Sequence, residues 1–138
     1  MEWPRVSTPP GVAERDWRDW TWQMQHRITS AAELAAFVKP SDDERRAIDA
    51  LAARFRFVIT PYYASLMDPA DPECPIRRQV VPRLAELEDP AGVADPLDEV
   101  AHSPVKNVVR VYGDRVAFCV NNECALYCRY CLRKRMVG

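Results

Sequence analysis

The sequence has few glycines, no excess of charge of either sign and no long apolar run. Only 4 of its 138 residues are glycine, whereas 12 are proline. Lys and Arg number 19 against 20 Asp and Glu, a formal net charge of −1, which argues against a protein that mainly neutralises phosphates or an anionic membrane surface. The longest apolar runs, such as residues 34–38 and 116–120, are far too short to span a bilayer. We therefore expect no nucleic-acid partner and no membrane partner.

We expect no secretory signal, because residues 1–5 lead into no apolar segment. A cytoplasmic location is the resulting expectation. Four of the five cysteines lie between Cys119 and Cys131. An odd total of five cysteines, four of them gathered in one short stretch, favours metal binding over a disulfide framework in a chain for which no signal is expected.

Three segments differ in their residue patterns. Residues 1–12 are rich in proline and aperiodic, which predicts a loose lead-in. Residues 13–107 are predicted to form a helical N-terminal region that ends in a long, proline-rich belt. Residues 108–138 combine the best strand pattern with the cysteine-rich stretch, and we expect them to begin a second unit.

Apolar spacing predicts the first helix. Trp17, Trp20, Met24 and Ile28 recur at intervals of three and four residues, which places them on one face of a single helix. For the tryptophans we favour packing in the core over a functional role.

Capping signals and turn residues predict the elements that follow. Residues 30–33 and 41–44 both read as capping boxes, each with a serine three residues before a glutamate, and each predicts the start of a helix. A further helix over residues 77–88 is limited by Pro82. Residues 108–120 are strand-like with a turn at 112–114.

The spacing Cys-x3-Cys-x2-Cys, formed by Cys124, Cys128 and Cys131, follows the strand directly. Three thiolates this close together repel one another, so a bound cation or cluster is the natural way to keep them deprotonated. A structural zinc site needs four protein ligands, and the remaining candidate, Cys119, reads more simply as a small buried apolar residue of the strand. The spacing matches neither common ferredoxin pattern. A [4Fe–4S] cluster held by three thiolates fits better, because it leaves one iron open, as a catalytic metal site requires.

Basic residues follow the cysteines. Residues 129–138 contain four Lys or Arg side chains and no acid. Such a run is normally a solvated face, although here it could also offset the negative charge of a cluster. A nucleic-acid patch is the weaker interpretation, since no larger basic surface accompanies the run.

The three cysteines, with Tyr130 directly before the last of them, resemble the motif of the radical S-adenosylmethionine enzymes. Further segments are similar to the lysine 2,3-aminomutase family within that superfamily. They are residues 17–23, 59–66, 68–77, 95–97, 103–105 and 112–116. The resemblance extends from about Trp17 to Gly138.

This resemblance implies an enzyme that moves an amino group on lysine or a related amino acid by means of a 5′-deoxyadenosyl radical. It assigns Cys124, Cys128 and Cys131 to a [4Fe–4S] cluster and places Tyr130 beside the adenine of S-adenosylmethionine. It further assigns Tyr112 and Arg115 to pyridoxal phosphate. An electron donor, an amino-acid substrate and a homo-oligomeric full-length protein are also implied.

The implied fold class is α/β. N-terminal helices would be followed by the first strand and the cluster loop of a partial β/α (TIM-like) barrel, and residues 108–138 would begin that barrel. Because a complete barrel takes about 250 residues, we expect this chain to be the N-terminal part of a longer protein, truncated after the cluster loop. We expect it to hold no catalytic residue and to be inactive alone.

Three alternatives stay open at this point. Val111 stands where the family has an arginine that helps to hold the phosphate, so a radical enzyme independent of pyridoxal phosphate is one. A second is the related aminomutase that prepares β-lysine for elongation factor P. The non-enzyme alternative is a small zinc-binding module complete in itself.

Overall fold

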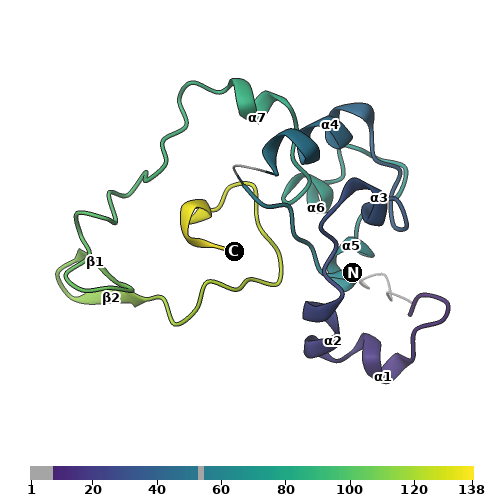
Figure 1. The fold of residues 1–138 in the computed structure, drawn as a ribbon, viewed down its shortest axis with the longest axis horizontal. Helices are drawn as coiled ribbons and strands as arrows, with labels where there is room; N and C mark the ends of the chain where they lie inside the picture. Colours follow the sequence, from purple (N-terminus) through teal and green to yellow (C-terminus); the bar gives the residue numbers. More distant parts are fainter. Residues whose placement is uncertain (1–7, 53–54) are drawn as a thin grey trace.

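The computed structural model describes residues 8–52 and 55–138, in which short helices precede a single β-hairpin (Figure 1). The elements are α1 (Glu14–Trp17), α2 (Trp20–Gln25), α3 (Ala31–Leu34), α4 (Asp42–Leu51), α5 (Pro61–Ala64), α6 (Pro75–Arg78), α7 (Ala85–Glu88), β1 (Val108–Tyr112), β2 (Arg115–Phe118) and the 3-10 turn η1 (Lys134–Met136). None of the helices in the described ranges is long and apolar enough to cross a membrane.

The predicted lead-in falls partly outside the described residues, which begin at residue 8. Residues 8–12 contain a turn in which the Val12 N–H donates to the Pro9 carbonyl oxygen at 3.2 Å. The expected single helix that follows is wrong, because α1 ends at Trp17 and α2 begins at Trp20. Asp19 interrupts it by capping α2, its carboxylate accepting the N–H of Thr21 at 2.7 Å.

That break separates the two tryptophans that were expected to pack together in the core. Trp17 is 5% exposed, but Trp20 is 75% exposed, so the core prediction holds for the first and is wrong for the second. Ile28 lies beyond α2 and forms an isolated antiparallel bridge with Ile59, with N–H···O distances of 2.8 and 3.1 Å.

Both predicted capping boxes are confirmed. The Ser30 hydroxyl accepts the Glu33 N–H at 3.2 Å, and the Glu33 carboxylate accepts the Ser30 N–H at 3.1 Å. Ser41 and Glu44 repeat the arrangement at the start of α4. The pKa of Glu33 lies below its ordinary value, chiefly because the backbone N–H of Thr29 also donates to its carboxylate.

Replacing Ser30 by alanine is expected to lower the free energy of unfolding by about 1 kcal/mol, since one N–H at the start of α3 loses its acceptor. Urea unfolding followed by circular dichroism measures this. Glu33→Gln should cost less, because an amide oxygen can still accept. The Glu33 carboxylate also makes a pH-dependent contribution to the free energy of unfolding. This contribution should be fully present above the pKa that Glu33 has in the unfolded chain, and it should be lost as the pH falls through the lower pKa that Glu33 has in the folded chain. Equal stability of Ser30→Ala and the unsubstituted chain would contradict the prediction.

The apolar core gathers side chains from the helices and from the bridge. Its fully buried members are Ile28, Leu34, Val38, Ile48, Phe57, Ile59, Ala64, Met67, Val80 and Val81. Leu126, from the cysteine-rich stretch, packs against this core. The stretch therefore docks on the helical body, although about 60 or more residues separate it in sequence from most of the core.

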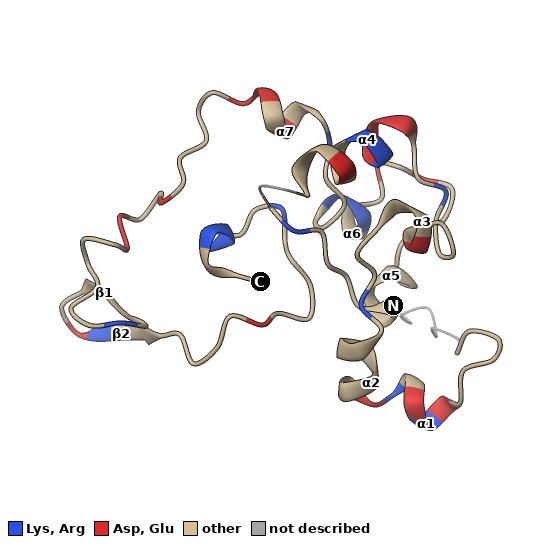
Figure 2. Cartoon of the chain, in the orientation of Figure 1, with Lys and Arg blue, Asp and Glu red and all other residues tan. Residues whose placement is uncertain are grey.

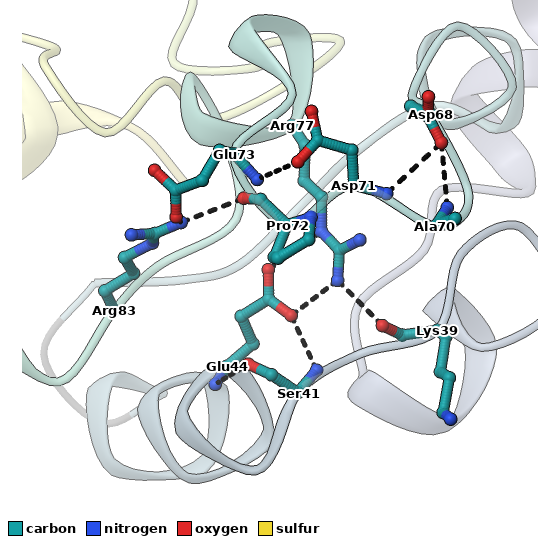
Figure 3. A network of polar contacts seen from close by, with 10 residues as sticks. All are labelled: Lys39, Ser41, Glu44, Asp68, Ala70, Asp71, Pro72, Glu73, Arg77 and Arg83. Atoms are coloured by element: carbon teal, nitrogen blue, oxygen red, sulfur yellow. Dashed lines mark hydrogen bonds and ion pairs between the residues drawn. The ribbon is translucent and has the colours of Figure 1, made fainter.

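A buried ion pair lies beside the core (Figure 3). The Arg77 guanidinium donates to both carboxylate oxygens of Glu44, at 2.8 and 2.6 Å, and to the Lys39 carbonyl oxygen at 2.8 Å. Both side chains are almost fully buried, 1% and 3% exposed. Glu44 thus closes its capping box and also fixes α6 against α4.

The predicted helix over residues 77–88 is wrong, because α6 and α7 occupy only its two ends and Pro82 lies in the gap between them. Residues 89–107, the belt, then run without a helix or an extended strand to the hairpin. The hairpin itself matches the expected turn, with Tyr112 opposite Arg115 and Val108 opposite Phe118.

The chain is therefore mixed α and β, but the described residues show no barrel. β1 and β2 pair antiparallel in a two-stranded sheet, whereas the strands of a β/α barrel are parallel. Figure 1 shows the hairpin away from the helical body, with the belt leading out to it and the chain then returning toward η1.

Candidate functional site

The cysteine loop, residues 121–131, is held against the helical body by several contacts. Arg27, just after α2, donates to the Glu123 carboxylate at 2.9 Å and to the Cys124 carbonyl oxygen at 3.1 Å. Farther along the loop, the Tyr127 N–H donates to the Val58 carbonyl oxygen at 2.9 Å, and its side chain is 7% exposed. The first half of the loop, up to Tyr127, is thus tied to the helical body.

Cys124, Cys128 and Cys131 are free thiols of intermediate exposure. Burial raises the pKa of the Cys124 thiol, and the nearby charges of Cys131 and Cys128 raise it further, so the three lie within electrostatic range of one another. Across residues 8–52 and 55–138, no group of three or more His, Cys, Asp or Glu side chains converges to hold a metal ion. Three thiols are the soft donor set that iron–sulfur clusters take, so the chemistry of the loop fits a cluster.

Tyr130 lies beside two of these thiols. Its pKa is raised, first by the charge of Cys128, then by burial, and also by Cys131. The ring is 66% exposed, and its hydroxyl donates to the Gln79 side-chain oxygen at 3.3 Å. Cys119, expected to be buried in the strand, instead follows β2 and is half-buried.

Tyr112 and Arg115 meet at the hairpin turn. The Arg115 guanidinium lies 5.6 Å from the centre of the Tyr112 ring, and it makes a two-pronged ion pair with the Asp114 carboxylate at 2.8 and 2.6 Å. A guanidinium and a phenol are groups that bind phosphate, so the residue types fit pyridoxal phosphate. Within the described ranges, no hydrogen bond or ion pair joins either residue to the cysteine loop, so the two groups of candidates are not brought together.

The basic side chains of residues 129–135 do not form a solvated face, which corrects that expectation. Each of the four cationic side chains forms an ion pair with a carboxylate of α7 or the belt. Figure 2 shows basic residues in blue at η1 and acidic residues in red on α7 and along the belt. The pairs are Arg129 with Glu86, Lys134 with Glu86, Arg133 with Glu99, and Arg135 with Asp95 and Glu99.

Sequence reasoning missed these carboxylates, although a signal was present. Residues 86–99 contain six Asp or Glu and no Lys or Arg. Residues 129–135 contain four Lys or Arg and no Asp or Glu. Four cations face three carboxylates. In the described part of the chain, N–H groups of Arg133 and Arg135 and one carboxylate oxygen each of Asp95 and Glu99 are buried without a hydrogen-bond partner.

Comparison with known proteins identifies relatives of the chain. It is 39% identical over 137 residues to L-lysine 2,3-aminomutase of Bacillus subtilis, covering 99% of this chain and 29% of the relative. It is 39% identical over 128 residues to L-lysine 2,3-aminomutase of Clostridium subterminale, and 39% identical over 125 residues to glutamate 2,3-aminomutase of Clostridioides difficile. These matches cover 92% and 91% of this chain and 31% and 30% of the relatives. The chain is homologous to the lysine and glutamate 2,3-aminomutases.

The homology extends over nearly all of this chain but over a limited part of the aminomutases. The chain spans about 30% of the length of the curated relatives it matches. No protein-family model matches it. The resemblance inferred from the sequence is thereby confirmed at the level of the family relationship.

Proposed function

We propose that this chain is the cluster-binding part of a radical S-adenosylmethionine 2,3-aminomutase that acts on lysine or a related amino acid. The observation that supports this best is the Cys-x3-Cys-x2-Cys loop, docked on a helical body in a chain 39% identical to lysine and glutamate aminomutases. The proposal includes an electron donor, a cytoplasmic location and a homo-oligomeric full-length protein.

Within this proposal, Cys124, Cys128 and Cys131 hold a [4Fe–4S] cluster, and Tyr130 flanks S-adenosylmethionine. When bound, the cluster supplies the electron that cleaves a carbon–sulfur bond of S-adenosylmethionine, and pyridoxal phosphate carries the migrating amino group. The role of the described residues is to bind and orient these groups. The basic side chains of residues 129–135 pair with carboxylates of α7 and the belt and so help to position the cysteines.

A second candidate is a radical enzyme that does not use pyridoxal phosphate. Val111 cannot make a guanidinium–phosphate contact, and Arg110 next to it donates to the Gly113 carbonyl oxygen at 2.7 Å. Arg115 is engaged by Asp114, so a phosphate would have to displace that carboxylate. Binding of pyridoxal phosphate by the purified chain, followed by its absorbance, decides between the two candidates.

Anaerobic reconstitution of the 138-residue chain with iron and sulfide tests the proposal. We expect a brown protein with about four iron atoms per chain, the content of one [4Fe–4S] cluster. After reduction, its electron paramagnetic resonance spectrum should change on addition of S-adenosylmethionine, because the iron without a protein ligand is open to it. We expect no turnover of lysine or glutamate by this chain alone.

Two outcomes would contradict the proposal. Zinc bound in equal amount to protein, with no brown colour, would identify a structural zinc module instead. A cluster whose spectrum ignores S-adenosylmethionine would indicate four protein ligands and an electron-transfer centre.

A further inference from the structure

Charged side chains attach the cysteine loop to α7, and attach the 3-10 turn that follows the loop to the belt. Arg129, which lies between Cys128 and Cys131, contacts both oxygens of Glu86 through N–H groups at 2.9, 3.1 and 2.6 Å. Its side chain is 8% exposed, and its backbone N–H donates to the Gln79 carbonyl oxygen at 2.7 Å. Two independent contacts therefore hold the backbone between these two cysteines.

A second fastening lies a few residues farther along the chain. The carboxylate of Glu99 is 2% exposed and pairs with Arg133 at 2.7 Å and with Arg135 at 3.4 Å. Arg135 also pairs with Asp95 at 2.9 Å. Burial acts to raise the pKa of Asp95, but the backbone N–H groups of Val100 and Glu99 and the Arg135 side chain outweigh it and lower that pKa overall.

The backbone hydrogen bonds of the belt are local or reach the hairpin region. The His102 N–H donates to the Asp98 carbonyl oxygen, the Arg110 N–H donates to the His102 carbonyl oxygen, and the Cys119 N–H donates to the Asn107 carbonyl oxygen. Salt bridges on an open surface contribute little, but desolvated guanidinium–carboxylate pairs are strong and are screened less by salt. The ion pairs therefore connect α7 and the belt to the segment from Arg129 to Arg135.

We propose that Glu86 and Glu99 are positioning residues that attach the segment from Cys128 to Met136 to α7 and to the belt, respectively, and so fix the backbone around two of the three cysteines. The fastening is a property of the metal-free chain. Its consequence for a bound cluster rests on the proposed function. Arg27 fixes the remaining cysteine separately, through the carbonyl oxygen of Cys124.

Hydrogen–deuterium exchange of the metal-free 138-residue chain tests the proposal. In Glu86→Gln and Glu99→Gln we expect the amides of residues 128–136, including the Arg129 N–H, to exchange about tenfold faster, the change that about 1.4 kcal/mol produces. The Tyr127 and Ile59 N–H groups, which donate to the core backbone, should keep their rates. This contrast separates a local effect from a general loss of stability.

Two substitutions nearby serve as matched controls. Glu88→Gln and Asp98→Asn each remove one negative charge from an exposed side chain one or two residues from the fastening. They should leave exchange unchanged. If Glu99→Gln does not fold, Glu86→Gln and Arg129→Lys, which keeps the charge but loses the two-pronged contact, decide the question. Exchange in residues 128–136 equal to that of the controls would overturn the proposal.

Reconstitution with iron and sulfide gives a second measurement, the spectrum of the reduced cluster. This spectrum should not change if Glu86 only stabilises the fold. In Glu86→Gln we expect the spectrum of the reduced cluster to become heterogeneous, while Glu88→Gln keeps the original line shape. If the chain binds no cluster but Glu86→Gln shows the faster exchange, the proposed function is contradicted and the positioning role of Glu86 is supported. If exchange is unaltered and a normal cluster forms, the positioning role is contradicted and the proposed function is supported.

Discussion

Replacing Glu44 by glutamine is expected to lower the free energy of unfolding by about 3–5 kcal/mol, because it leaves the Arg77 charge buried without a counter-charge. Glutamine can still accept at the capping box of α4, so most of the loss is assigned to the ion pair. Arg77 has few ways to compensate, since its side chain is 1% exposed and its Nη1 atom already has no partner in the described part of the chain. Urea unfolding followed by circular dichroism measures the effect.

A neighbouring arginine provides the control for this experiment. Arg78 pairs with Glu73 at 3.4 Å, and both side chains are 58% exposed. Arg78→Gln should therefore cost at most about 1 kcal/mol, as an exposed pair does. The double variant Glu44→Gln/Arg77→Met should recover part of the loss, because no unpaired charge stays buried. A loss below about 1 kcal/mol in Glu44→Gln alone would show that water reaches Arg77 and that the pair is not a support of the fold.

The features that could be predicted from the sequence are those that neighbouring residues determine. Each capping box depends on a serine and a glutamate three residues apart, and both boxes form as expected. The hairpin turn over residues 112–114 is similarly local. The spacing of the three cysteines indicated only the radical S-adenosylmethionine superfamily, whereas segments such as residues 17–23 and 59–66 indicated the aminomutase family. The comparisons confirm that relationship.

The features that could not be predicted depend on contacts between distant residues or on competing local signals. The spacing of Trp17 and Trp20 suits one helix. Asp19 lies between them, however, and aspartate is more favourable at the N-cap of a helix than in a helix interior, so a new helix begins there. The pairing of Glu99 with Arg133 crosses more than 30 residues of belt and hairpin. Opposite charge in two segments suggests that they meet, but only the fold determines which carboxylate faces which cation.

Replacing any one of Cys124, Cys128 or Cys131 by serine is expected to reduce iron incorporation from about four atoms per chain to nearly none. A hydroxyl is a poor ligand for cluster iron, and two remaining thiolates do not hold a [4Fe–4S] cluster against loss. Iron and sulfide analysis after anaerobic reconstitution measures the effect. The variants should keep the helical circular dichroism of the unsubstituted chain, because the three thiols are half-buried and lie outside the apolar core.

Cys119→Ser is the matched control, and it also tests the choice of ligands. Cys119 is half-buried and lies five residues before the first cysteine of the motif, so its replacement should leave the iron content unchanged. A zinc or iron centre whose fourth thiolate is Cys119 would be lost in this variant as in the other three. Loss of metal from all four variants would therefore contradict a three-cysteine cluster. Loss from three with retention in the fourth is the result expected of a site that keeps one iron open for S-adenosylmethionine.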